Sequence, residues 1–345
     1  MQIIFKMIKN KNVTIIAKSE PFINFMKCFL IIGVVAIHSD INYQGPPDIN
    51  LTGSYIATFF SQKLAAVVVP CFFILSGYLY FRNIKVFDFQ VYKKKLKSRI
   101  YTLVIPYILW NFLDLACYLI KYYLIESNTD CLSLFQVIKD GYPYAFAFWF
   151  IRNLIFFVLI SPAAYLIGGL NKWILIAFLL ILMGFNIPLG GFEYFTIGCG
   201  ITRFVPDSFF NLPSLKIWIL ISLWLIFSII ILFIDFDRFF ISVKITMTIC
   251  AFFGLYNFFK KYYTRLVNKI TLSVVASTFY IYALHQFLCF PVKNLFIKIF
   301  GVTTFWESMT AYFGNFLAVL VLSYSIWLLM KHTLPRLTNI LSGNR

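Results

Sequence analysis

The sequence has few charged residues, and few of those are acidic. Asp, Glu, Lys and Arg together make up 12% of its 345 residues, and 13 residues are acidic, whereas soluble domains average about 25% charged residues. Hydrophobic residues make up 61% of the chain, and the mean hydropathy is +0.84. A water-soluble globule could not cover so many apolar side chains with polar surface. The composition therefore excludes a soluble enzyme and predicts an integral membrane protein.

The sequence also lacks the motifs of several common kinds of site. Its seven cysteines form no C-x-x-C pair, so we expect neither a disulfide framework nor a metal site. No Walker sequence is present, which argues against ATP hydrolysis. No linker-rich stretch divides the chain, and we expect one transmembrane domain, residues 22–331, between the cytoplasmic segments 1–21 and 332–345.

Apolar runs long enough to cross a bilayer recur along the chain. A hydrocarbon core about 30 Å thick requires about 20 residues of helix, and these runs lack the alternation of barrel strands. We therefore predict an all-α fold, a polytopic transmembrane bundle of about ten helices with both termini in the cytoplasm. Pro188, Gly190 and Gly191 separate the fifth and sixth segments, which could instead form a broken or re-entrant pair. The predicted spans are 22–39, 57–81, 100–124, 145–168, 173–189, 191–206, 216–235, 239–259, 272–291 and 312–331.

Basic residues are distributed unevenly between the two predicted sides of the membrane. With the N-terminus inside, most Lys and Arg residues fall in cytoplasmic segments, and the outer side holds only Lys139, Arg238, Lys293 and Lys298. This asymmetry is the positive-inside signal of membrane proteins. It also explains the net charge of +17 without a nucleic-acid partner, since basic loops beside apolar spans meet anionic lipid headgroups.

Polar residues inside the apolar spans are the candidates for function, because each is costly at the centre of a bilayer. In the first span Lys27 and His38 are eleven residues apart, about three helical turns and ~16 Å of rise, so they lie on one face. In the ninth span Thr271, Thr278 and His285 recur every seven residues and also share a face. A lone histidine at a span end is as often a headgroup-level residue as a catalyst. Two histidines at similar depth, in the outer half of the membrane, favour a site.

One cation lies deeper in the apolar sequence than the others. Arg152 falls two turns into the fourth span and needs a partner, for which Glu193 and Asp114 are candidates. A purely structural ion pair explains Arg152 equally well. Asp114 could simply bond a neighbouring helix, and Glu193, near the outer end of the sixth span, could be solvated.

Several short motifs occur in a fixed order between residue 22 and about residue 290. They are Lys27 and His38 separated by ten residues, F-F-I-L-S-G-Y-L at Phe72–Leu79, a basic-to-aromatic stretch at Arg99–Trp110, W-F-I-R-N-L at Trp149–Leu154 and I-Y-A-L-H at Ile281–His285. In this order they resemble acyltransferase family 3, bacterial membrane O-acyltransferases of about ten helices that acylate cell-surface glycans. The resemblance covers most of the chain.

The resemblance implies an enzyme that transfers an acyl group from cytoplasmic acyl-CoA, usually acetyl-CoA, to a hydroxyl of a surface polysaccharide or lipid-linked sugar. Such a protein lies in the bacterial cytoplasmic (inner) membrane and needs no bound cofactor, since acetyl-CoA is its substrate. His38 would act as general base or carry an acyl-histidine intermediate. Arg82 and Arg99 could equally be ordinary positive-inside anchors. The implied roles of the other residues are catalytic support by His285 and Arg152, acyl-CoA binding by Lys27, Arg82 and Arg99, and shaping of the site by Trp149, Ser76 and Glu193.

Two other classes of membrane protein remain open. A transporter or flippase for lipid-linked glycans would also place His, Arg and Glu inside the membrane, although the two halves of the sequence show no duplication. A polysaccharide polymerase would be expected to carry a large external loop, whereas the longest predicted ones, 126–144 and 292–311, are short.

Overall fold

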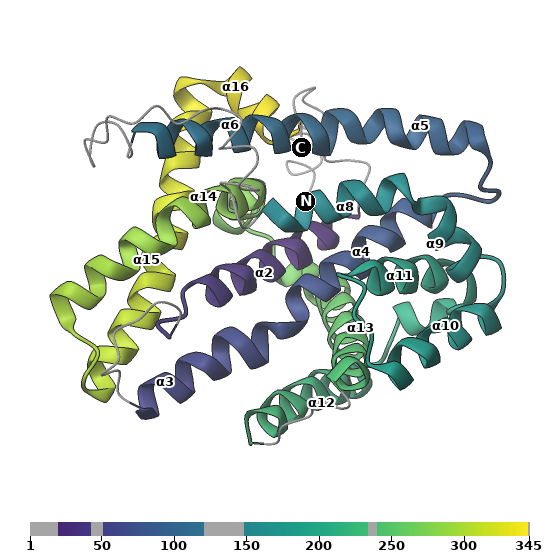
Figure 1. Ribbon diagram of the computed structural model, residues 1–345, viewed down its shortest axis with the longest axis horizontal. Helices are drawn as coiled ribbons and strands as arrows, with labels where there is room; N and C mark the ends of the chain where they lie inside the picture. Colours follow the sequence, from purple (N-terminus) through teal and green to yellow (C-terminus); the bar gives the residue numbers. More distant parts are fainter. Residues whose placement is uncertain (1–19, 43–50, 121–147, 234–239, 344–345) are drawn as a thin grey trace.

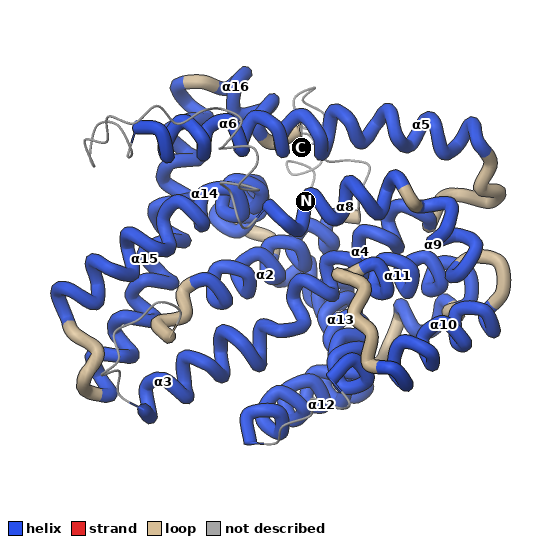
Figure 2. Tube along the Cα trace, viewed as in Figure 1, coloured by secondary structure: helices blue, strands red, loops and turns tan. Residues whose placement is uncertain are grey.

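The computed structural model describes residues 20–42, 51–120, 148–233 and 240–343, and every regular element within these ranges is helical (Figure 2). The all-α prediction is therefore confirmed. Nearly all of the predicted N-terminal segment lies outside the described residues. So do the outer loop 126–144, Lys139, Arg238 and the ends of four predicted spans at 121–124, 145–147, 234–235 and 239.

The helices follow the order of the predicted spans. The first span is α2 (Pro21–His38). The second is one long helix made of α3 (Leu51–Thr58), an irregular helical stretch over 59–67 and α4 (Val68–Phe81). The third consists of α5 (Phe89–Arg99), a π-helical turn and α6 (Ile105–Ile120). The remaining helices are α8 (Trp149–Leu159), α9 (Ser161–Gly168), α10 (Lys172–Phe185), α11 (Phe192–Phe204), α12 (Ser214–Phe233), α13 (Phe240–Leu266), α14 (Lys269–Phe300), α15 (Phe305–Thr333) and α16 (Pro335–Leu341).

Not every predicted span is long enough to cross a membrane by itself. Seven helices in the described residues have the length and apolar composition for a crossing, and the bent pair α8–α9, with an angle of 71°, gives an eighth if counted as one span. The fifth and sixth predicted spans are α10 and α11, of 14 and 13 residues, short of the roughly 20 that a full crossing takes. The protein is a multi-pass membrane bundle. Its ten-pass count and cytoplasmic termini stay predictions.

Helix α2 lies in the middle of the bundle. It packs against α14 and α15 on one side and against α4 and α13 on the other (Figure 1). Ile23, Met26, Leu30 and Val35 of α2 are completely buried. The buried face of α2 therefore contacts several other helices rather than lipid.

The close packing of α4 on α11 depends on two glycines. A Cβ atom on Gly77 of α4 would lie 2.1 Å from the Phe195 carbonyl oxygen, and one on Gly198 of α11 would lie 2.3 Å from the Ile74 carbonyl oxygen. Both oxygens belong to the backbone, so a larger residue would push the helices apart. Gly77 thus lets α11 pack directly on α4, which ends at Phe81, just before Arg82.

Helix α14 is longer than predicted, and this changes the place of Lys293. The prediction of a loop over 292–311 is wrong, because α14 continues to Phe300 and the turn before α15 is residues 301–304. Pro291 does not end the helix, since neighbouring groups in membrane bundles compensate for its missing backbone donor. Gly301, with a φ of 78°, ends it instead. Lys293 is therefore a helical residue, and it is only 2% exposed.

We expect Gly77→Ala to lower the melting temperature, because overpacking of a tight contact costs about 1–3 kcal/mol. Gly184→Ala is the control, since a Cβ there would meet nothing within 4 Å and alanine favours a helix by up to ~1 kcal/mol. Thermal unfolding of the purified protein in detergent measures both variants. Equal melting temperatures would contradict the importance of the α4–α11 contact.

Candidate active site

Two histidines that are distant in the sequence meet in the bundle. His38 is the last residue of α2, and His285 lies near the middle of α14. Their ring centroids are 4.9 Å apart and the ring planes are inclined by 53°. The side chain of His285 is completely buried. The two imidazoles therefore form a pair inside the protein.

Hydrogen bonding orients the His285 ring. Its Nδ1 lies within hydrogen-bond distance of the Tyr282 carbonyl oxygen, and because a carbonyl can only accept, Nδ1 carries a proton. In the neutral ring Nε2 then holds a lone pair, and this atom has no hydrogen-bond partner among the described residues. An imidazole held in this way can accept a hydrogen bond or a proton from a group placed beside it.

A cavity of about 190 Å³ lies beside His38. Its wall is built by α2, α4, α8 and α14 together. Trp149, at the first turn of α8, lines it and packs on Phe73 with ring centroids 6.3 Å apart. His38, Trp149 and Tyr282 are the lining residues with a polar group. The other lining residues are Ile31, Val34, Ile37, Val69, Phe72 and Phe150.

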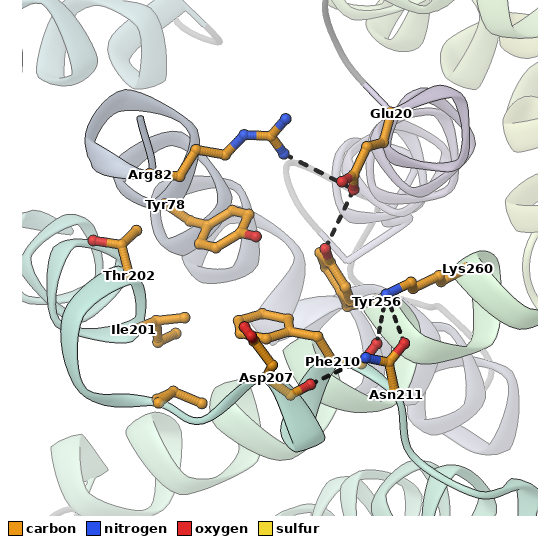
Figure 3. Close-up of a pocket in the computed structure, with 11 residues that line it drawn as sticks. Glu20, Tyr78, Arg82, Ile201, Thr202, Asp207, Phe210, Asn211, Tyr256 and Lys260 are labelled. Carbon is orange, nitrogen blue, oxygen red and sulfur yellow. Dashed lines mark hydrogen bonds and ion pairs between the residues drawn. The ribbon is translucent and has the colours of Figure 1, made fainter. Parts of the chain in front are cut away.

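A second pocket, of about 400 Å³, lies at the opposite end of α2. There Arg82 forms an ion pair with Glu20, with 3.9 Å between Nη1 and Oε2, and the Tyr256 hydroxyl donates to the same carboxylate at 3.4 Å. Lys260 donates to the Asn211 side-chain oxygen at 2.8 Å. Figure 3 shows these groups around one open space. The pocket is polar and carries charges of both signs, unlike the cavity beside His38.

Comparison with known proteins identifies the family. Residues 20–328 match a family model described as an acyltransferase domain. The chain belongs to acyltransferase family 3. That family model describes an acyltransferase domain, and the transporter, flippase and polymerase alternatives lack such support.

The similarity to an individual protein covers a smaller part of the chain. Over 157 residues the acyltransferase is 27% identical to the succinoglycan biosynthesis protein ExoH of Rhizobium meliloti (strain 1021). This alignment covers 41% of the acyltransferase and 40% of ExoH, so it spans less than half of either protein. No solved structure matches the acyltransferase.

Arg152 of the acyltransferase lies apart from the histidine pair. Phe150 lines the cavity, and two residues along a helix correspond to a rotation of about 200°, so the Arg152 side chain is exposed on the other face of α8. Glu193 is buried and accepts the backbone N–H of Gly191 at 3.1 Å. Among the described residues Arg82, not Arg152, forms an ion pair, with Glu20. The sequence-based ion pair of Arg152 with Glu193 or Asp114 is therefore absent from this part of the chain.

The three cations predicted to bind acyl-CoA have different surroundings. Arg82 lines the charged pocket. The Arg99 guanidinium lies 5.9 Å from the centroid of the Tyr80 ring, close to the same end of α4, but outside that lining. Lys27 lies on α2 between the charged pocket and the cavity, about three turns from His38. Ser76 has a similar place on α4, one turn beyond Phe72.

Sequence reasoning missed a buried polar cluster just beyond His38. Asp40 is 4% exposed and accepts hydrogen bonds from Ser61 at 2.7 Å, from Gln62 at 3.1 Å and from the Asn42 backbone at 2.9 Å. Lys293 donates to the Asp40 carbonyl oxygen at 3.3 Å and attracts its carboxylate. These contacts hold the end of α2 against the irregular helical stretch over 59–67 and against α14.

The signal for this cluster was present but weak. Asp40 directly follows the predicted first span, and Lys293 lies two residues beyond Pro291, where the predicted ninth span ends, so both resemble solvated residues at the membrane surface. Ionisable residues so close to apolar helices usually face a partner inside the bundle. Only the three-dimensional structure identifies the partners, because they are 253 residues apart in the sequence.

We expect Lys293→Met to lower the melting temperature, because the buried Asp40 carbonyl loses a hydrogen bond from a charged donor, which is worth about 1.5–3 kcal/mol. The double variant Asp40→Asn/Lys293→Met removes both charges and should recover part of the loss. Lys298→Met, at an exposed position on the same helix, is the control and should have no effect. Thermal unfolding in detergent measures all three variants. If the melting temperature of the double variant fell by the sum of the decreases in the two single variants, the two residues would not interact.

Proposed function

We propose that this protein is a membrane O-acyltransferase that transfers an acyl group, such as acetyl, from cytoplasmic acyl-CoA to a hydroxyl of a surface polysaccharide or lipid-linked sugar. The observation that carries the proposal is the His38–His285 pair beside an apolar cavity. A charged pocket lies at the other end of the same helix. These two spaces suit the two ends of acyl-CoA, which is anionic at its nucleotide and apolar at its short acyl group.

The charged pocket is the proposed site for the nucleotide of the donor. Arg82 and Lys260 contribute two cations to it, and such groups bind phosphate oxygens through charge-assisted hydrogen bonds. Glu20 is paired with Arg82, so a phosphate would compete with this carboxylate. From Glu20 to His38 the chain of α2 rises by ~27 Å. The pantetheine arm would extend along this path, past Lys27 and Ser76.

His38 is the proposed general base. Its ring takes the proton of the acceptor hydroxyl, and the hydroxyl oxygen attacks the carbonyl carbon of the thioester. The carbon–sulfur bond breaks, and the proton passes from the imidazolium to the departing thiolate, which leaves as coenzyme A. The His285 ring lies beside that of His38 and its Nε2 has no other partner among the described residues, so His285 is the proposed group that stabilises the charged state of His38. In the alternative mechanism His38 itself attacks the thioester and coenzyme A leaves, and the sugar hydroxyl then takes the acyl group from the acyl-histidine as the neutral imidazole is restored.

Two observations support a polysaccharide acceptor on the outer side of the bacterial cytoplasmic (inner) membrane. The relative ExoH is named for succinoglycan biosynthesis. His38 also lies at the end of α2 opposite to the charged pocket. Donor and acceptor would thus approach the histidine from different sides of the membrane, which avoids moving the donor across it.

We expect His38→Ala to lower acylation of the surface polysaccharide by at least ~10²-fold, the usual contribution of a general base. His332→Ala is the control, because His332 is exposed near the end of α15. Mass spectrometry of polysaccharide from cells that produce each variant at equal level measures the acyl groups. Normal acylation with His38→Ala would refute the catalytic assignment.

We expect Arg82→Gln and Lys27→Ala to weaken the binding of radiolabelled acetyl-CoA to the purified protein, by at least about tenfold for Arg82, since one charge-assisted contact is worth about 1.5–3 kcal/mol. Arg265→Gln, at an exposed position near the end of α13, should bind as the unmodified protein does. Unchanged affinity in Arg82→Gln would remove the charged pocket from the donor site, and unchanged affinity in Lys27→Ala would remove Lys27.

A further inference from the structure

The cavity beside His38 has a wall that suits an apolar group and not a sugar. Six of its nine lining residues are aliphatic or phenylalanine side chains. A sugar ring carries several hydroxyls, and most of them would lose their hydrogen bonds to water without full replacement, since only three lining residues carry a polar group. The acceptor must therefore approach His38 from outside this cavity.

The wall also excludes a second charge. His38 is the single titratable side chain in the lining apart from the phenol of Tyr282, and no Lys or Arg is part of it. A carboxylate at the far end of an acyl chain, as in a dicarboxylic acyl group, would be buried here without a cation. The cavity therefore favours uncharged acyl groups.

The volume of the cavity limits the length of the acyl chain that it can hold. The cavity measures about 190 Å³, and an apolar cavity of about 150 Å³ in another protein holds one benzene molecule, with six carbon atoms. A linear acyl group of up to about six carbons fits by this comparison. A longer chain would have to displace side chains of the wall.

Wall residues from two other helices line the same cavity as His38. His38 belongs to α2, whereas Val69 and Phe72 come from α4 and Phe150 comes from α8. The rings of Phe72 and Phe150 pack together, with centroids 5.6 Å apart. A thioester whose carbonyl carbon is at His38 would direct its alkyl chain toward these side chains.

We infer that this cavity holds the acyl group that is transferred, and that Val69 and Phe72 determine which short, uncharged acyl chains the enzyme accepts. The inference rests on the proposed function, because it assigns one part of the proposed donor to a space in the protein. It goes further in naming the chemical class of the acyl group and the side chains that select it.

The test uses membrane vesicles with the cytoplasmic face outward that contain the full-length protein and the native polysaccharide. Acetyl-, butyryl-, hexanoyl-, octanoyl- and succinyl-CoA are supplied in turn, and mass spectrometry measures the acyl groups transferred. We expect transfer from acetyl to hexanoyl, and little from octanoyl or succinyl. Val69→Phe fills the cavity and should lower the hexanoyl-to-acetyl ratio of kcat/KM at least about tenfold, the usual effect of a poorly fitting alkyl group.

Phe72→Ala enlarges the cavity and should raise the octanoyl-to-acetyl ratio by a similar factor. This variant keeps the test decisive if Val69→Phe fails to fold. The controls make the same exchanges at exposed positions, Val321→Phe on α15 and Phe156→Ala on α8, where the side chains are 62% and 56% exposed. Both controls should keep the chain-length profile of the unmodified protein.

The outcomes separate this inference from the proposed function. If the unmodified protein transfers acyl groups but neither cavity variant changes the ratios, or if succinyl is transferred as well as acetyl, the acyl assignment of the cavity is wrong and the proposed function stands. If the unmodified protein transfers none of the five thioesters, the proposed function is itself overturned, and the inference with it.

Discussion

The contact between His38 and His285 is the interaction on which the rest of the site depends. One imidazole comes from the end of α2 and the other from the middle of α14, and their centroids are 4.9 Å apart. Two such rings can remain together in an apolar bundle only while the helices keep their rotation and depth, since an imidazole turned toward lipid would lose its polar contacts. The Asp40–Lys293 cluster, directly beyond the pair, holds the same two helices together.

The surroundings of α2 change from charged at one end to apolar at the other. At one end Arg82 and Glu20 belong to an open, charged pocket. At the other end the cavity beside His38 is almost wholly apolar. A molecule with an anionic head and a small apolar end can satisfy both environments at once, whereas a sugar satisfies neither completely. The arrangement thus gives the donor a binding path within the bundle and leaves the acceptor to approach the histidine from the opposite side.

Much of the site could be predicted, because it depends on helical periodicity. The eleven-residue spacing of Lys27 and His38 predicts a common face, and α2 has both on one continuous helix. Arg152 shows the limit of this reasoning. Its sequence position indicates a buried charge, yet α8 turns Trp149 and Phe150 to the cavity and leaves Arg152 exposed. The rotation of a helix about its axis depends on its neighbours, which the local sequence does not specify.

The sequence by itself determined the class of the protein: apolar runs of this length require a helical membrane bundle, and the motif order indicates the family that the comparisons confirm. The tertiary structure alone decided which polar groups meet. Lys293, predicted in a loop, is a buried neighbour of Asp40 in the structure, and two histidines far apart in the sequence are in contact. The physical reason is that hydrophobicity and helical period are local properties. How closely two helices pack, as at Gly77 against Phe195, depends on contacts between segments far apart in the chain.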